Sequence, residues 1–167
     1  MNAAGLCAQA VARSIEGVPP ATIPPCYYAR GHYFVFSGAS PFHHLVYPVA
    51  VAGGLGIHVT LDLEGHARFG PDVQWIDSID YSFDETRAPQ FAAAIRQYWP
   101  ALPADGLQPG YTGIRAKLGP AGSAAQDFLF QGPRDHAVPG LVALYGIESP
   151  GLTASLAIAE HVMNLLR

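Results

Sequence analysis

An imidazole in an alternating segment is the first group in this chain that could do chemistry. Residues 55–63 alternate between apolar and polar side chains, which predicts a strand with His58, Thr60 and Asp62 on its polar face. Histidine changes charge near neutral pH, so His58 could remove the proton of a substrate hydroxyl. The alternative is a histidine that faces solvent or is hydrogen-bonded in a shallow cleft, and the local pattern favours this alternative.

A guanidinium in a segment with few charges is the second such group. Residues 111–115 predict a strand that ends in Arg115, and Lys117 would share its face. Arginine can hold a carboxylate by two parallel hydrogen bonds. A surface salt bridge accounts for the same arginine equally well, so the local sequence leaves both interpretations open.

The third candidate is the segment Gly-Ile-Glu-Ser-Pro-Gly-Leu-Thr at residues 146–153, which predicts the start of a helix. An apolar strand leads into it, and Ser149 with Pro150 forms an N-cap and first-turn pair. Gly151 would let a ligand approach the backbone, and the free amides of a helix start suit an anionic or electron-rich group. An ordinary capped helix is the alternative. Three- and four-residue steps place on one apolar helical face Leu152, Leu156, Ala159, Met163 and Leu166.

Several familiar motifs are missing from the sequence, including a P-loop, a nucleophile elbow and zinc-ligand spacings. Gly54-Leu-Gly56 fails as a dinucleotide fingerprint, because Val59 stands where the third glycine is needed and a strand follows. Cys7 and Cys26 form no metal-spaced pair, so we expect buried free thiols in a reduced compartment. No metal site is expected.

The bulk composition restricts the class of protein. The chain has 167 residues, enough for one domain with its own core, and half of them are hydrophobic. A formal net charge of −4 gives no reason to expect nucleic acid or an anionic membrane surface as a partner. Glycines and Pro48 interrupt the longest apolar run, residues 45–63, so we expect two strands there and no transmembrane segment.

The order of elements predicts an α+β fold with a mostly antiparallel sheet and three helices. The 18 glycines and 15 prolines indicate many turns and short strands. Helices are expected at 6–15, at 84–99, where Asp84 is the N-cap, and after residue 149. Strands are expected at residues 27–30, 32–36, 45–47, 55–63, 67–69, 111–115, 127–131 and 141–145.

Taken together, these motifs resemble the carboxy-terminal half of FAD-dependent oxidoreductases of the D-amino-acid oxidase superfamily, in the L-2-hydroxyglutarate oxidase/dehydrogenase-like branch. The glycine-rich dinucleotide-binding unit of such proteins is not in this sequence. The chain therefore looks like a fragment whose partner is an amino-terminal FAD-binding half. The segments that carry the resemblance are residues 2–6, 30–34, 45–49, 54–60, 69–71, 113–115 and 146–155.

The resemblance implies a division into domains. Residues 1–24 would be a remnant of a Rossmann-like FAD-binding domain, residues 25–135 a substrate-binding domain, and residues 136–167 the last strand and helix of the FAD-binding domain. It also implies FAD as the cofactor and a small 2-hydroxy acid as the substrate, oxidised by hydride transfer to the flavin. The chain alone is expected to be inactive, in the cytoplasm or at the periphery of the inner membrane.

The resemblance assigns roles to single residues as well. His58 would take the hydroxyl proton, and Arg115 would hold the substrate carboxylate, helped by Tyr111 and Tyr47. An amino-acid oxidase of the glycine or sarcosine type would use the same arginine, and an inactive substrate-domain subunit is a further alternative. The expected cofactor contacts are Asn2, Ala3, Gly5, Gly146, Ser149, Gly151, Leu152 and Thr153.

Overall fold

The computed structural model describes residues 1–49 and 56–167, which form two compact units. Unit 1 comprises Met1–Tyr28 and Arg115–Arg167, and unit 2 comprises Ala29–Ile114. The predicted domain boundaries, after residues 24 and 135, stay a prediction, and they do not coincide with the limits of these units. Residues 129–131 pair with the strand at 143–145 and so join unit 1. Residues 54 and 55 of the predicted motif lie outside the described residues.

Unit 1 is built around a short sheet. Strands β6 (Leu129–Gln131) and β7 (Ala143–Tyr145) pair in antiparallel register, with Phe130 opposite Leu144. Asn2 extends this sheet on the other side of β7 through a parallel bridge to Ala143. The predicted strand endings at 131 and 145 are therefore confirmed.

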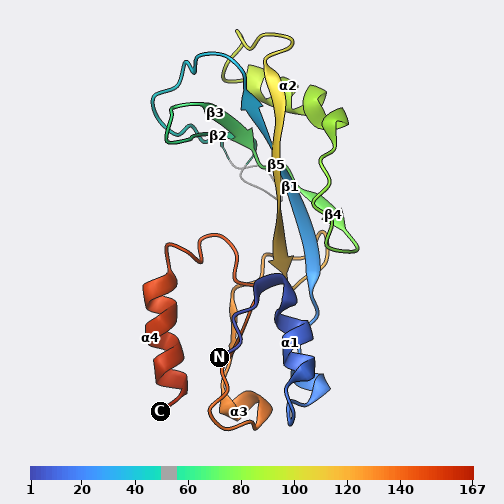
Figure 1. The fold of residues 1–167 in the computed structure, drawn as a ribbon, viewed down its shortest axis with the longest axis vertical. Coiled ribbons are helices and arrows are strands. Elements are labelled where there is room, and N and C mark those ends of the chain that lie inside the picture. The colour runs from blue at the N-terminus through green and yellow to red at the C-terminus, as the bar shows by residue number, and fades with distance from the viewer. Residues whose placement is uncertain (50–55) are drawn as a thin grey trace. The chain divides into compact units, whose positions relative to one another are not determined.

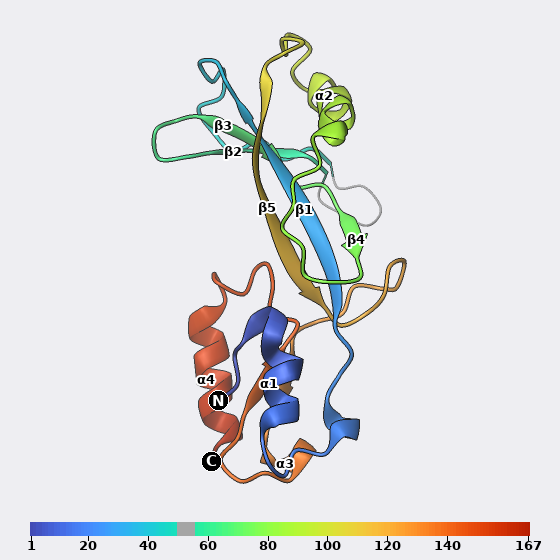
Figure 2. The same cartoon turned by 45° about the vertical axis from the view of Figure 1, so that its right-hand side comes forward.

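Helices cover both faces of this sheet, because alternate residues of a strand point to opposite sides. Ala143 and Tyr145 pack against Ala8 and Ala12 of α1 (Ala8–Ser14). Leu144 packs on the opposite face with Val162 of α4 (Ser155–Leu165). Figure 1 and Figure 2 both show α1 and α4 flanking the strands of this unit.

The start of α4 differs from the prediction. Its N-cap residue is Ala154, and no side chain caps the helix, so Ser149 is not an N-cap. The Gly151 amide donates to the Glu148 carbonyl oxygen at 2.5 Å, and the chain makes tight turns before the helix begins at Ser155. The predicted pairing of Ser149 and Pro150 at a helix start is wrong, because both residues lie inside the turn that the Gly151 amide closes on Glu148.

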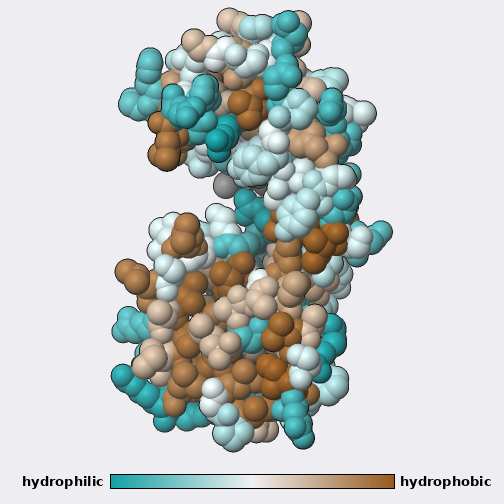
Figure 3. Space-filling model, viewed as in Figure 1, coloured by the Kyte–Doolittle hydropathy of each residue, from teal (hydrophilic) through white to brown (hydrophobic). Residues whose placement is uncertain are grey.

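The face that α4 buries also differs from the predicted apolar stripe. Val162 is buried, and Ile158 and Leu165 pack beside it. The predicted stripe is exposed instead, with Leu152 at 91% and Leu156 at 85%. Apolar side chains flank the buried face on both sides, so the periodicity could not identify which of them are buried. Figure 3 shows hydrophobic residues spread over the visible surface of unit 1.

A single helical turn, α3 (Pro133–His136), lies between β6 and β7. The Gly132 amide donates to the Asp135 carboxylate at 2.7 Å, which caps this turn. Within the described ranges, no helix combines the length and the apolar character needed to cross a membrane.

Unit 2 contains a larger sheet in which the strand order is β2-β3-β1-β4, and β5 also pairs with β1. Two predicted strands at 27–36 are one continuous strand, and the predicted strand at 45–47 forms only the bridge between Val46 and Val59. The strand predicted at residues 111–115 is longer and begins at Leu107. The strands are β1 (Tyr27–Phe36), β2 (His58–Leu61), β3 (Ala67–Gly70), β4 (Gln74–Ile76) and β5 (Leu107–Lys117).

Helix α2 (Ala88–Arg96) covers this sheet through an aromatic core. Asp84 accepts a hydrogen bond from the Thr86 amide at 3.1 Å, which confirms it as the predicted cap. The helix ends at Arg96 and not at residue 99, because the next amides bond three residues back and tighten the chain into turns. The fully enclosed residues of the core are Phe34, Val59, Ala67, Phe69, Phe91 and Ile95.

A buried network of charged and polar side chains joins β1 of unit 2 to the residues just before α2. The Asp72 carboxylate accepts from the His32 amide at 2.7 Å and contacts the His32 Nδ1 atom at 3.0 Å. It also pairs with Arg87, which precedes α2. Because the Asp72 side chain is only 4% exposed, this carboxylate connects β1 to α2 with little competition from water.

Candidate functional site

Arg115 and Lys117 bind one carboxylate of the chain itself. The Arg115 Nη1 atom donates to the Glu148 Oε2 atom at 3.0 Å, and the Lys117 Nζ atom donates to Glu148 Oε1 at 2.5 Å. The two cations occupy the same face of β5, as predicted from their spacing. The salt-bridge interpretation of Arg115 therefore holds in this structure, while its role as a ligand of a substrate carboxylate stays a prediction.

Glu148 is the residue that the sequence analysis missed. It lies inside the segment 146–153, but its spacing from Arg115 gives no signal in a linear pattern. Its side chain is 14% exposed, against 36% for Arg115 and 34% for Lys117. The cluster thus presents its cations outward and its carboxylate inward, with a net charge of +1.

Two glycines give the segment its shape. A Cβ on Gly146, whose φ is +68°, would lie 2.8 Å from the Leu118 side chain. A Cβ on Gly151 would lie 2.7 Å from the Glu148 carbonyl oxygen. The absence of a side chain at Gly151 thus serves a turn of the chain itself, and the approach of a ligand there stays a prediction. Ser149, Leu152 and Thr153 are exposed.

Two segments are predicted to bind the cofactor, one at the amino terminus and one at residues 146–153. They leave the sheet of unit 1 side by side. The Asn2 amide donates to the Val142 carbonyl at 2.8 Å, and the Leu144 amide donates to the Asn2 carbonyl at 2.9 Å. Since the two segments run in parallel, residues 3–5 and 146–153 both follow the carboxyl ends of their strands at one edge. Ligands of α/β sheets bind outside this kind of edge.

The side chain of Asn2 serves the fold. Its Nδ2 atom donates to the Ala8 carbonyl at 2.8 Å, and its Oδ1 atom accepts from the Ala4 amide at 3.3 Å. Ala3 and Gly5 are exposed, and Gly5 has a φ of +56°. Residues 3–5, Ser149, Leu152 and Thr153 are exposed, while the Ala4 amide already donates to the Asn2 side chain and the Gly151 amide to the Glu148 carbonyl. These features fit a flat ring system with polar edges, whereas the described residues supply no glycine-rich turn for a pyrophosphate.

In unit 2, the structure brings His58 and Tyr47 together. Their rings stack with centroids 4.3 Å apart and planes 14° from parallel. His58 is 6% exposed and Tyr47 is 53% exposed, so the phenol covers the imidazole. The paired amides and carbonyls of Val46 and Val59 set this register.

Asp62, predicted on the same strand face as His58, is committed to the turn between β2 and β3. It accepts from the His66 amide at 2.8 Å and from the Arg68 guanidinium at 3.2 Å. The hydrogen bond from the His66 backbone lowers the pKa of this carboxyl group. Tyr111 likewise stacks on Tyr33, with ring centroids 4.6 Å apart.

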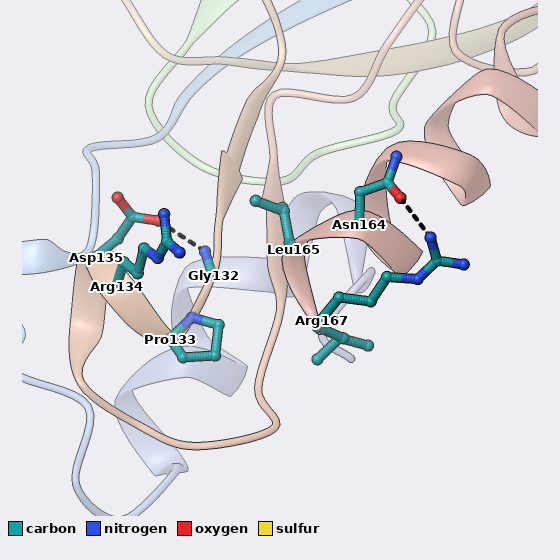
Figure 4. Close-up of a pocket in the computed structure, with 8 residues that line it drawn as sticks. Gly132, Pro133, Arg134, Asp135, Asn164, Leu165 and Arg167 are labelled. Carbon is teal, nitrogen blue, oxygen red and sulfur yellow. Dashed lines mark hydrogen bonds between the residues drawn. The ribbon is translucent and has the colours of Figure 1, made fainter.

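A pocket at the end of α4 holds none of the predicted site residues (Figure 4). Of its polar side chains, Asp135 accepts from the Gly132 amide and Arg167 donates to Asn164 at 3.4 Å. Among the described residues, no group of three or more histidine, cysteine or acidic side chains could hold a metal ion.

Comparison with known proteins finds relatives that match almost the whole chain, among them two dehydrogenases. The chain is 49% identical to the mitochondrial L-2-hydroxyglutarate dehydrogenase of Arabidopsis thaliana over 98% of its length. It is 27% identical to the L-2-hydroxyglutarate dehydrogenase of Salmonella houtenae, again over 98% of its length. The chain spans 36% of the first relative and 46% of the second.

A solved structure has the same fold. The dithionite-reduced L-alpha-glycerophosphate oxidase of Mycoplasma pneumoniae with FAD bound matches 99% of this chain with a TM-score of 0.77 and 23% sequence identity. The match covers 41% of that protein. Residues 1–165 also match the family described as FAD dependent oxidoreductase. Because this match takes in almost the whole chain, the chain belongs to that family of FAD-dependent oxidoreductases.

Proposed function

We propose that this chain provides the substrate-binding part of a flavoprotein that oxidises a small 2-hydroxy acid of the L-2-hydroxyglutarate type. The observation that carries the proposal is the junction of Arg115 with the segment 146–153 through Glu148. One unit thus holds both the cation for a substrate carboxylate and a segment assigned to the cofactor. The 49% identity to the Arabidopsis thaliana enzyme supports this choice of substrate.

Arg115 binds the substrate carboxylate in this proposal. Its Nη1 atom is held by Glu148, and among the described residues its Nε and Nη2 groups donate to no other side chain. Those two groups form the edge of the guanidinium that can donate two parallel hydrogen bonds to a carboxylate. Tyr111 assists from the same strand, β5.

His58 is the proposed base. A neutral imidazole that takes the hydroxyl proton raises the electron density at the carbon bearing the hydroxyl, which favours loss of hydride. Tyr47 stacks on the ring, keeps bulk water from its face and fixes its orientation.

FAD, when bound, accepts the hydride, and the chain holds it with residues at the sheet edge described above. The exposed backbone at Ala3 and Gly5 and at Ser149, Leu152 and Thr153 faces the cofactor in this proposal. The exposed backbone at Leu152, next to the Gly151 amide that donates to Glu148, would offer a hydrogen-bond donor to the bound ring system. The phosphates and adenosine are bound by an amino-terminal half with a Rossmann-like fold, of which residues 1–24 and 136–167 complete the sheet and helix layers.

The test uses a chimera in which this chain replaces the matched segment of the Arabidopsis thaliana relative. The purified chimera should show flavin absorbance and reduce a dye with L-2-hydroxyglutarate. Arg115→Ala should raise KM by roughly tenfold to a hundredfold, since a hydrogen bond to a charged group contributes about 1.5–3 kcal/mol. His58→Gln should lower kcat and abolish the acidic limb of the pH–rate profile.

The control is Arg134→Ala, because Arg134 is exposed and forms no ion pair with another described residue. Glycine and sarcosine test the amino-acid oxidase alternative, and turnover of these amines without turnover of hydroxy acids would establish it. A chimera that binds flavin but oxidises neither class would identify the chain as an inactive substrate-domain subunit.

A further inference from the structure

The charges of Arg115, Lys117 and Glu148 affect which kind of anion can bind beside them. Its two cations are one-third exposed, while the carboxylate between them is 14% exposed. Both Glu148 oxygens are used, one by each cation. A single carboxylate therefore orients two side chains that would otherwise move independently on the strand.

We propose that Glu148 is a positioning residue that selects a singly charged carboxylate head over a doubly charged phosphate head. The inference rests on the proposed function of Arg115 as the anion ligand. With Glu148 ionised, the cluster has a net charge of +1, which matches one carboxylate. Without that carboxylate, the net charge would be +2, which matches the dianion of a phosphate monoester.

Electrostatics gives the direction of the effect. The negative charge of Glu148 repels an incoming anion in proportion to the charge of that anion. A dianion is therefore penalised about twice as strongly as a monoanion at the same distance. Removing the charge relieves both anions, but it relieves the dianion more.

The geometry adds to this selection. Because Glu148 holds the Nη1 end of the Arg115 guanidinium, the opposite edge presents two parallel donors. A planar carboxylate matches this pair, as in bidentate arginine–carboxylate contacts. The Lys117 ammonium is a compact point charge that would suit a phosphate, and Glu148 neutralises it at 2.5 Å.

The experiment measures competitive inhibition of the chimera by propionate and by methyl phosphate, above the second phosphate pKa of about 6. Glu148→Gln should shift the ratio of the two inhibition constants towards methyl phosphate by on the order of tenfold. Glu148→Asp keeps the charge and should leave the ratio within about twofold. Glu160→Gln is the matched control, because Glu160 is exposed on α4 and the substitution changes the total charge equally.

A second measurement does not depend on catalysis. Nitrogen-15 labelling of the arginines of the 167-residue chain should give an Arg115 side-chain signal that shifts with propionate more than with methyl phosphate. Glu148→Gln should reverse this order and speed rotation of the guanidinium. If Glu148→Gln does not fold, Lys117→Gln should move the ratio the opposite way, towards propionate.

An equal shift in Glu148→Gln and Glu160→Gln, or no change in either assay, would overturn the role of Glu148. Failure of the proposed function has a different signature, since the flavin-loaded chimera would then oxidise no 2-hydroxy acid. The anion titration of the labelled chain would still show whether Glu148 favours propionate over methyl phosphate.

Discussion

Asn2 and Ala143 form a parallel bridge, although 140 positions of sequence separate them. The bridge makes the first residues of the chain a neighbour of β7, whose continuation is the segment 146–153. The two segments assigned to the cofactor from sequence thus leave one sheet at one edge. The Asn2 side chain adds hydrogen bonds to Ala8 and Ala4 beside this bridge.

Asn2→Ala should destabilise unit 1 by about 1–3 kcal/mol, because it removes a buried donor and a buried acceptor. Hydrogen exchange of the amides in α1 and β7 should become faster, while those of β3 keep their rates. Asn164→Ala is the matched control, since Asn164 is exposed and its one bond, to Arg167, spans 3.4 Å. Equal protection in both variants would show that the Asn2 side chain does not hold the bridge.

Gly151→Ala should destabilise the chain by about 1–3 kcal/mol, because the added methyl group meets Ile147 Cγ2 at 2.6 Å and the Glu148 carbonyl oxygen at 2.7 Å. Relief of the clash should also displace the Glu148 carboxylate from Arg115. Thermal unfolding measures the first effect, and the nitrogen-15 signal of Arg115 measures the second. Gly113→Ala serves as control, because no atom lies within 4 Å of its added Cβ.

Asp72→Asn should destabilise unit 2 by about 3 kcal/mol, because it leaves the half-buried Arg87 cation without its ion pair. Both tryptophans of the chain, Trp75 and Trp99, lie in unit 2, so their fluorescence during urea unfolding reports on this unit. Asp105→Asn at an exposed site should change stability by less than about 0.5 kcal/mol. Coincident unfolding curves for the two variants would contradict the role given to Asp72.

Tyr98 should make the chain sensitive to alkaline pH. Burial raises the pKa of its phenol above the ordinary value, and its hydroxyl donates to the Ile57 carbonyl at 3.1 Å. The folded chain holds this proton more tightly than the unfolded chain. The contribution of the protonated Tyr98 phenol to the free energy of unfolding is therefore complete below the pKa of about 10 in the unfolded chain. It is lost as the pH rises towards the pKa in the folded chain.

Tyr98→Phe should remove this alkaline loss while lowering stability at neutral pH by about 1 kcal/mol, through the missing hydrogen bond. Ultraviolet absorbance of phenolate gives the titration, and unfolding at a series of pH values gives the stability. Tyr81→Phe at an exposed site is the control. If wild type and Tyr98→Phe lost stability in parallel above pH of about 10, the assignment to Tyr98 would be wrong.

Local signals in the sequence predicted most of the elements. Asp84 caps the turn that leads into α2, and Ala67 begins β3, because a cap and a hairpin turn depend on neighbours within a few residues. The same local approach failed at α4. Ser149 and Pro150 have the composition of a helix start, but the turn from Glu148 to Gly151 postpones the helix to Ser155.

The sequence by itself determined the class of fold, the family resemblance and the pairing of Arg115 with Lys117 on one strand face, because alternation and motif order are properties of the linear chain. Only the tertiary structure decided that Glu148 lies between those cations, that Tyr47 covers His58, and which face of α4 is buried. Contacts between residues distant in sequence depend on how strands and helices pack. The local sequence around an apolar helix or a single carboxylate does not predict which distant residues it will contact.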